Sequence, residues 1–376
     1  MKILLATNFL KGSLSAIETA NCLKKGILSV DNKTEIEIIP IADGGDGTIE
    51  AIKYCSDYTE IVSIVCGPLE QEVAAKWLIL NINNEKVAII EGAQANGLSI
   101  LRPDEYNPLK ATSYGIGQLV LSALEHECSK IYVTIGGSAT NDCGIGIIQA
   151  LGGKFLDKDS EEIKKGGEGL ENLESIDLTG LDKRLNTTKL IVACDVDNPL
   201  CGPNGASAVY GPQKGATPEL VEYLDKNLSH VADLVAENIN NDLRDYPGVG
   251  AAGGIGFAFK AILNATLTPG FDLVAELSSM KKKIKSADIV ITSEGRLDSQ
   301  SLSGKAPYQI AKLANEHNIP TIVIAGSVEK KLDLSYTNIK AALSITDGPL
   351  SLEEARKNAS YLGENCGRQI MNLFIL

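Results

Sequence analysis

Short apolar runs that lead through polar, glycine-containing turns into helical patterns occur at both ends of the chain, and they restrict its fold more than any other feature. The run Lys2–Thr7 precedes helical spacing over Ser15–Leu28, and Glu35–Ile41 precedes the helical segment Ile49–Cys55. The alternation returns near the other end in Ala287–Thr292, Ala306–His317, Thr321–Ala325, Ala341–Ile345 and a closing helix over Glu353–Phe374. Alternating strands and helices predict a parallel sheet with helices on both faces.

The middle of the chain has a different pattern of apolar residues. The runs Glu60–Cys66, Val73–Leu80 and Lys86–Ile90 are rich in Val and Ile and lie between short turns, which indicates an antiparallel or mixed sheet. Further strands are expected at Lys130–Ile135 and Lys189–Ala193, and helices over 111–124, 147–151, 218–238 and 257–263.

A chain of 376 residues is long enough for two or three domains, and the pattern favours two. We expect an α/β protein in which residues 1–60 and 285–376 form a flavodoxin-like or Rossmann-like doubly wound parallel sheet. Residues 61–284 are then an inserted second α/β domain with a mixed sheet. The strand at 130–135 could belong to either domain.

Charge and composition exclude several classes of protein. Lys and Arg number 35 against 48 Asp and Glu, so the formal net charge of −13 argues against nucleic acid or an anionic membrane surface as the main partner. No apolar stretch approaches the roughly 18 residues of a membrane span, and Ile3–Ala6 is too short for a signal-peptide core. The eight cysteines form no CxxC pair and the three histidines have no zinc-site spacing. We expect a cytoplasmic protein, and the oligomeric state is left open.

Glycine is more frequent than in average proteins, at 36 of 376 residues, but the sequence does not satisfy two familiar nucleotide-binding motifs. Gly304-Lys305 is followed by Ala306, so it is not a P-loop. The GxGxxG pattern at 248–253 follows Asp245-Tyr246-Pro247, which cannot be a strand, so nicotinamide chemistry is not expected. The glycines of 248–256 either let backbone N–H groups approach an anion at a helix start or allow tight helix packing.

Pairs of carboxylates follow two of the expected strands. Asp43 and Asp46 lie on a glycine-rich turn, where they could hold Mg²⁺, orient a hydroxyl or cap the next helix. Asp195 and Asp197 follow the buried strand Lys189–Ala193, and strand alternation directs both side chains to one face. Two neighbouring acids there are costly unless they are solvated, metal-bound or paired, so this pair is a candidate functional site.

Basic side chains accompany these acids. Arg296 lies between Glu294 and Asp298, after the expected strand Ala287–Thr292. Its guanidinium could bind a carboxylate or phosphate bidentately, or it could form ion pairs with these two neighbouring acids. Lys11 and Lys214 each lie on a glycine-flanked turn, where a lysine either meets an anion or is simply solvated. Cys143, Cys194 and Cys201 have no neighbouring histidine, so we interpret them as small buried residues.

Taken together, the motifs resemble the type-1 glycerate kinases of bacteria over essentially the whole chain. The segments that carry the resemblance are Lys11–Ala16, Ala42–Thr48, Ile135–Asp142, Cys194–Leu200, Tyr210–Ala216 and Glu294–Asp298. The resemblance implies ATP-dependent phosphorylation of D-glycerate with Mg²⁺, and it favours 2-phosphoglycerate as the product. It also implies a two-domain protein with a flavodoxin-like domain and an inserted α/β domain.

Two departures from the family pattern concern acidic positions. The family usually has Pro-Asp-Ser-Phe before the Lys-Gly-Ser motif, whereas this chain has Thr7 to Leu10, so the amide of Asn8 replaces a carboxylate. In the acidic turn the family usually has Asp-Gly-Gly-Glu-Gly, and here Asp46 replaces the longer Glu.

Phosphoryl transfer needs positioning, neutralisation of the triphosphate and a carboxylate that accepts the hydroxyl proton. Our hypothesis is that Asp195 or Asp197 is that base or a Mg²⁺ ligand, and that Arg296 grips the glycerate carboxylate. The further candidates for contact with glycerate or ATP are Lys11, Ser13, Asp43, Asp46, Gly136, Gly137, Ser138, Asn141, Lys214, Gly253, Gly254, Glu294, Asp298 and Lys305. Lys11, Lys214 and Lys305 would neutralise phosphates, and Gly136–Gly137 and Gly253–Gly254 would supply backbone donors. The alternatives are a kinase for another small hydroxy acid and a non-catalytic sensor of glycerate or nucleotide.

Overall fold

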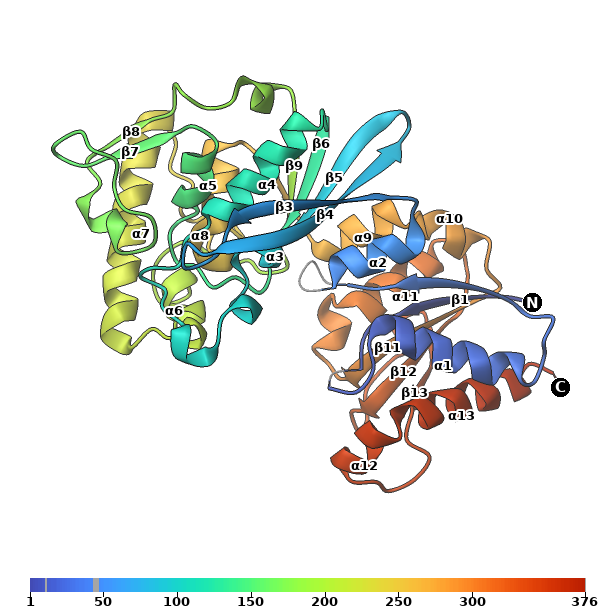
Figure 1. The fold of residues 1–376 in the computed structure, drawn as a ribbon. Coiled ribbons are helices and arrows are strands. Elements are labelled where there is room, and N and C mark those ends of the chain that lie inside the picture. The colour runs from blue at the N-terminus through green and yellow to red at the C-terminus, as the bar shows by residue number, and fades with distance from the viewer. Residues whose placement is uncertain (11, 43–46, 376) are drawn as a thin grey trace. The chain divides into compact units, whose positions relative to one another are not determined.

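The computed structural model describes residues 1–10, 12–42 and 47–375 (Figure 1). The chain divides into two compact units. The first unit comprises Met1–Asp43, Glu50–Ser56 and Phe271–Leu376, and the second comprises Gly44–Ile49 and Asp57–Gly270. The sequence placed the two divisions at residues 60 and 285. The second division falls earlier because two short helices, α9 (Gly270–Leu277) and α10 (Met280–Lys285), follow it and pack in the first unit.

The first unit is built on a five-stranded sheet in the order β13-β12-β11-β1-β2, in which every neighbouring pair is parallel. Its strands are β1 (Lys2–Thr7), β2 (Glu35–Pro40), β11 (Ile289–Leu297), β12 (Thr321–Val328) and β13 (Ile339–Ser344). Numbered within the unit, the order is 2-1-3-4-5, which is the flavodoxin-like order. The second unit is inserted between the second and third strands. The expected fold class is therefore confirmed.

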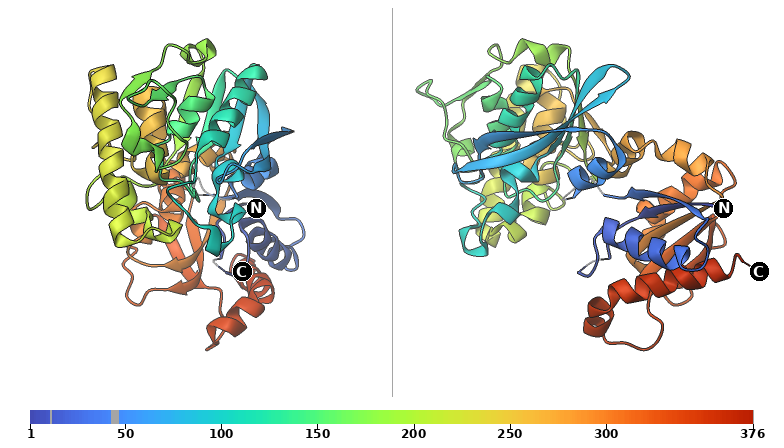
Figure 2. Two further views of the ribbon diagram at one scale, coloured as in Figure 1. Left: turned by 60° about the vertical axis from the view of Figure 1, so that its left-hand side comes forward. Right: turned by 45° about the vertical axis from the view of Figure 1, so that its right-hand side comes forward.

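Helices cover both faces of this sheet. On one face α1 (Ala16–Leu28) and α13 (Ala359–Asn372) lie side by side and share a core with β1 (Figure 2). The two helices approach closely because both have glycine at the contact: a Cβ on Gly26 would lie 1.9 Å from the carbonyl oxygen of Glu364. On the other face, α10 and α11 (Ala306–Asn315) pack on the side chains that point the opposite way, such as Leu4 and Val290.

The second unit is built on a six-stranded mixed sheet in the order β10-β9-β6-β5-β4-β3. Its strands are β3 (Thr59–Cys66), β4 (Glu72–Ile82), β5 (Glu85–Glu91), β6 (Lys130–Thr134), β9 (Lys189–Ala193) and β10 (Thr266–Thr268). Strands β5, β6, β9 and β10 run parallel, whereas β3 and β4 pair antiparallel at one edge. The strand at 130–135 thus lies in the second unit. A small hairpin-like pair, β7 (Lys154–Leu156) and β8 (Ser175–Asp177), lies apart from this sheet.

Two large clusters of buried apolar residues stabilise the described part of the second unit. In the first, α4 (Tyr114–Glu125) and a short π-helical turn at Ala258–Ile262 pack on the sheet around Trp77. In the second, α7 (Pro218–Ile239) packs over β7 and the segment 163–173. The remaining helices are short: α2 (Thr48–Cys55), α3 (Ala93–Asn96), α5 (Ile145–Ala150), α6 (Ala206–Tyr210), α8 (Ala251–Phe257) and α12 (Leu352–Lys357).

The expected closing helix is wrong in extent. The segment Glu353–Phe374 contains two helices, α12 and α13, because α12 ends at Asn358. Ser351 starts α12 in a capping box with Glu354, and this helix spans only 6 residues. Within the described residues, no helix combines the length and the apolar character that crossing a membrane requires.

Candidate active site

The carboxyl ends of β5, β6 and β9 lie at one edge of the second unit's sheet because these neighbouring strands run parallel. The loops that follow them contain the glycine-rich and acidic motifs of the sequence. In open α/β sheets this edge is where ligands bind.

Asp195 and Asp197 are both exposed in the loop after β9, whereas Cys194 and Val196 are half-buried. Exposed and half-buried residues thus alternate in this loop beyond the end of β9. The Asp195 Oδ1 atom accepts a hydrogen bond of 2.8 Å from the backbone N–H of Gly270. Burial raises the pKa of the neighbouring Cys194 thiol to about 11, so this cysteine is a neutral packing group near pH 7, as the sequence indicated.

The loop after β6 is held by its own polar side chains. Asp142 is 1% exposed, and its carboxylate accepts hydrogen bonds of 2.8 Å from both the backbone N–H and the hydroxyl of Ser113. Burial raises the pKa of Asp142, and these hydrogen bonds oppose the rise. Asn141 is fully buried and donates to the hydroxyl of Ser207 at 3.1 Å. The Asn141 side chain therefore helps to fix the conformation of this loop.

Lys214 is also buried, with 2% exposure. Its ammonium donates to the Ser138 hydroxyl at 3.0 Å and to the Thr140 carbonyl oxygen at 2.7 Å. Burial lowers the pKa of Lys214 from 10.5 to about 7, and the nearby charge of Asp142 opposes this shift. The sequence suggested that Lys214 neutralises phosphates, but the structure holds its ammonium inside the protein, where it clamps the loop after β6.

The two glycine pairs differ in accessibility. Gly137 is exposed with a positive φ of 72°, and Gly136 is half-buried, so the backbone at this turn is open to a ligand. Gly253 and Gly254 are buried, and a Cβ on Gly253 would lie 2.0 Å from the carbonyl oxygen of Thr140. The second pair therefore matches the alternative of tight packing better than that of anion binding.

In the first unit, the point where the strand order reverses lies between β1 and β11. The Ser293 hydroxyl donates to the carbonyl oxygen of Asn8 at 2.8 Å across this point. The Asn8 side-chain oxygen accepts a hydrogen bond from the backbone N–H of Phe9, so this amide stabilises the turn that follows β1. Ser13 is exposed and donates to the carbonyl oxygen of Leu10 at 3.0 Å. Lys11, Asp43 and Asp46 lie outside the described residues.

The end of β11 carries a charged cluster. Lys305 pairs with Glu294 at 3.4 Å, and Arg296 lies 3.6 Å from Asp298. Hydrogen bonds from Ser301 lower the pKa of Asp298. The Arg296 side chain is 68% exposed, and its one ion pair within the described residues is this long contact with Asp298, so most of its donors face solvent.

Sequence reasoning missed Glu91 and gave no role to Asp142 or Ser113. Glu91 ends β5, is 5% exposed and accepts a hydrogen bond of 3.1 Å from the N–H of Ile49. The signal for Glu91 was present, because an acid at the end of a run of buried apolar residues is unusual. Ser113 and Asp142 are 29 residues apart, and nothing in either segment indicates that they pair.

The described residues contain no group of three or more His, Cys, Asp or Glu side chains placed to hold a metal ion. The exposed pair Asp195 and Asp197 nevertheless suits Mg²⁺, which proteins commonly bind through one or two carboxylates together with substrate phosphates and water. The donor set of this loop therefore fits a magnesium ion that binds together with a nucleotide.

Comparison with known proteins gives a consistent result. The model of the glycerate kinase family matches residues 3–375. A glycerate kinase of Bacillus subtilis (strain 168) is 43% identical over 371 residues, which cover 98% of this chain and 97% of that one. A glycerate 2-kinase of Escherichia coli (strain K12) is 42% identical over 360 residues, with coverage of 96% and 94%. The crystal structure of a candidate glycerate kinase 2 from Salmonella typhimurium LT2 superposes with a TM-score of 0.88 at 42% identity, covering 100% and 98% of the two chains.

Two α/β units with acidic and basic groups at their strand ends, together with these matches, define a phosphotransferase. The chain belongs to the glycerate kinase family. It is accordingly a kinase, which implies that it uses ATP.

Proposed function

We propose that the protein transfers the γ-phosphoryl group of ATP to the 2-hydroxyl of D-glycerate with the help of Mg²⁺. The observation that carries this proposal is the exposed carboxylate pair, Asp195 and Asp197, at the carboxyl end of β9 in a chain of this family. The similarity to the E. coli glycerate 2-kinase favours the 2-position. The eight free cysteines are consistent with a reducing cytoplasm, where we expect the protein to work.

The two carboxylates have complementary tasks in this proposal. One accepts the proton of the glycerate hydroxyl as it attacks, and the other holds Mg²⁺. When bound, Mg²⁺ would neutralise charge on the ATP phosphates. The hydrogen bond from Gly270 N–H to Asp195 fixes the direction of that carboxylate before substrate arrives. Fixed orientation matters because the rate gain in phosphoryl transfer comes mainly from positioning and electrostatics.

Basic groups of the first unit are proposed to bind negatively charged parts of the substrates. We propose that Arg296 binds the glycerate carboxylate through two parallel hydrogen bonds, since its guanidinium is exposed. Lys305, which pairs with Glu294, and Lys11 are proposed to neutralise phosphates. Ser13, Asp43, Asp46 and Asp298 belong to the same sequence motifs and remain proposed contacts of glycerate or ATP. In the second unit, the open backbone at Gly136 and Gly137 is proposed to donate to an anion.

The burial of Lys214 supports another task than the neutralisation of phosphates that its sequence position suggested. We propose that it positions the loop after β6, because its ammonium bonds Ser138 and Thr140 within the protein. Asp142 holds the other end of the same loop through Ser113. The two buried side chains would thus keep Gly136 and Gly137 in one conformation.

Release of ADP from ATP and Mg²⁺, measured with D-glycerate and with related hydroxy acids, tests the proposal. We expect the highest kcat/KM with D-glycerate. A higher value with another hydroxy acid would transfer the proposal to that substrate, and no release with any of them would favour a sensor. Phosphorus NMR of the product separates 2-phosphoglycerate from 3-phosphoglycerate.

A further inference from the structure

The strand β3 forms one edge of the second unit's six-stranded sheet, because among the described strands it pairs with β4 alone (Figure 1). It is 8 residues long and follows β4 in one continuous register without a bulge. The opposite edge strand, β10, has only 3 residues. Proteins usually protect an edge strand by shortness, a bulge, Lys or Pro, since its open backbone groups can pair with another strand. The sequence of β3, TEIVSIVC, has none of these protections.

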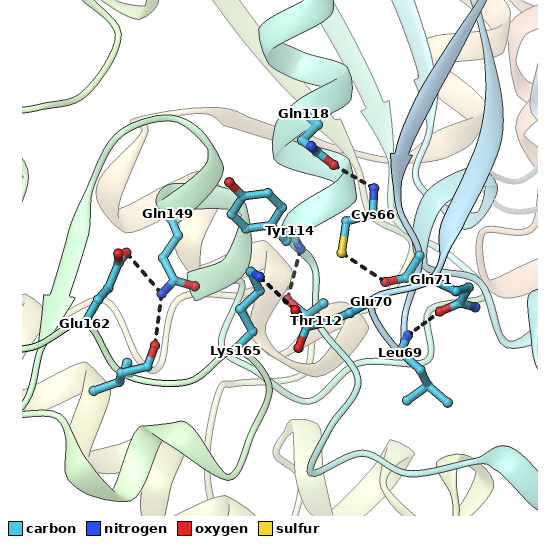
Figure 3. A network of polar contacts seen from close by, with 12 residues as sticks. Cys66, Leu69, Glu70, Gln71, Thr112, Tyr114, Gln118, Gln149, Glu162 and Lys165 are labelled. Atoms are coloured by element: carbon cyan, nitrogen blue, oxygen red, sulfur yellow. Dashed lines mark hydrogen bonds and ion pairs between the residues drawn. The ribbon is translucent and has the colours of Figure 1, made fainter.

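The hydrogen bonds of the β3–β4 pair show which backbone groups point to the open edge. The N–H of Gly67, directly after β3, donates to the carbonyl oxygen of Gln71 at 2.6 Å. Because hydrogen-bonded positions alternate in an antiparallel pair, the odd-numbered residues of β3 bond to β4 and the even-numbered ones point away from it. Cys66 agrees with this pattern, since its N–H donates instead to the side-chain oxygen of Gln118 on α4 at 2.7 Å (Figure 3). The Gln118 side chain thus closes one end of the open edge.

Val62 and Ile64 remain open along this edge. Their N–H groups make no hydrogen bond within the described part of the chain. Their side chains lie on the face of β3 opposite to the core that contains α4, and they are 55% and 63% exposed. Among the described strands, no other large apolar side chain is exposed. The edge therefore presents backbone donors and acceptors beside an exposed apolar strip.

We propose that two copies of the chain pair through β3 as antiparallel strands, about a two-fold axis at Ser63. Val62 of each copy then lies directly opposite Ile64 of the other, and the N–H and C=O groups of these residues form four hydrogen bonds across the edge. The two opposite pairs of β-branched side chains stabilise the contact. The two sheets join into one continuous sheet.

The chemistry of the edge favours a second copy over a different partner. The strip is self-complementary, because the same two residues, Val62 and Ile64, supply every donor, acceptor and apolar contact in both copies. Two chains with a formal net charge of −13 repel each other unless they meet where the charge is locally balanced. Glu60 is the one charged residue of β3, and its carboxylate lies 3.5 Å from the ammonium of Lys76 on β4. The strip is therefore neutral within an acidic protein.

Sedimentation velocity of the full chain, from low micromolar concentrations to about 100 µM, tests the proposal. No substrate is needed, so the outcome does not depend on the proposed kinase reaction. We expect a species of twice the mass of the chain that dissociates on dilution or persists throughout. A monomer at every concentration would overturn the proposal.

A charged variant locates the interface. Val62→Lys with Ile64→Lys places like charges opposite each other and should give a monomer over the whole range. Both side chains are exposed, so the variant should remain folded, which Trp77 fluorescence checks. The matched control is Leu352→Lys with Tyr361→Lys, which adds the same charge at exposed apolar positions of the first unit and should leave the dimer unchanged. A dimer that persists in the β3 variant would contradict the assignment.

A proline variant separates strand pairing from apolar contact alone. Val62→Pro removes the N–H that points to the open edge and costs no hydrogen bond to β4. Because each dimer loses this donor twice, we expect its dissociation constant to rise by about tenfold or more. Val62→Ile keeps the N–H and the branched side chain, so it should dimerise like the wild type. An unchanged dissociation constant in Val62→Pro would overturn the pairing through β3.

Discussion

Replacing Lys214 by Met should change how the stability of the second unit depends on pH. In the native protein, burial lowers the pKa of Lys214 from 10.5 to about 7. Below about pH 7 the lysine is protonated in both the native and the unfolded state, so the native state carries the full cost of burying the charge. Between pH 7 and 10.5 only the unfolded state keeps the proton, so the free energy of unfolding rises with pH.

The size of the effect follows from the same shift. With a native pKa of about 7, this lysine adds about 2 kcal/mol to the free energy of unfolding between pH 7 and pH 9. Lys214→Met lacks the titrating group, so it should lack this increase. Other titrating groups contribute to both proteins and largely cancel when the two are compared.

The assay uses the single tryptophan, Trp77, which is buried in the second unit and reports on that unit alone. Urea unfolding followed by Trp77 fluorescence at both pH values gives the free energies. Lys158→Met, at an exposed lysine of the same unit, should behave like the wild type. If the wild type and Lys214→Met respond equally to pH, the reasoning that burial shifts this pKa is refuted.

Three further predictions concern backbone contacts and substrate binding. Gly253→Ala should destabilise the second unit by about 1–3 kcal/mol more than Gly202→Ala. Both glycines have a positive φ, but of the two only Gly253 has a carbonyl oxygen within 4 Å of the added Cβ. Urea unfolding followed by Trp77 fluorescence measures the difference. Gly26→Ala should lower the melting temperature of the first unit, since its Cβ would meet the backbone of α13, whereas Gly348→Ala, with no neighbour within 4 Å, should not. Arg296→Lys should raise the KM for glycerate by about tenfold or more, with a smaller effect on kcat, because lysine cannot bind a carboxylate bidentately. Unchanged KM in that variant would remove Arg296 from the glycerate site.

Patterns that repeat locally could be predicted from the sequence. The strands β1 and β9 have the predicted bounds, because short apolar runs between polar turns are a strong signal. The alternation of exposed Asp195 and Asp197 with half-buried Cys194 and Val196 also agrees with the predicted strand-like pattern. Elements of three residues, such as β7 and β10, were not predicted, since they are too short to show any periodicity.

Features that depend on distant contacts could not be predicted. Lys214 lies on a glycine-flanked turn like a solvated lysine, and only folding brings it to Ser138 and Thr140, which are 76 and 74 residues away. From the sequence, Gly253 and Gly254 left both an anion site and tight packing open, and the choice between them depends on the backbone of Thr140. A single sequence does not contain these distances.

The most direct test of the central claim is the turnover number of Asp195→Asn and Asp197→Asn with ATP, Mg²⁺ and D-glycerate. Asparagine keeps an oxygen that can accept the hydrogen bond from Gly270 N–H, so folding should be preserved, and Trp77 fluorescence in urea verifies this. The account predicts that kcat falls by about a hundredfold or more in at least one variant at unchanged stability. Turnover within about twofold of the wild type in both variants would contradict the proposal that this pair performs proton transfer and metal binding.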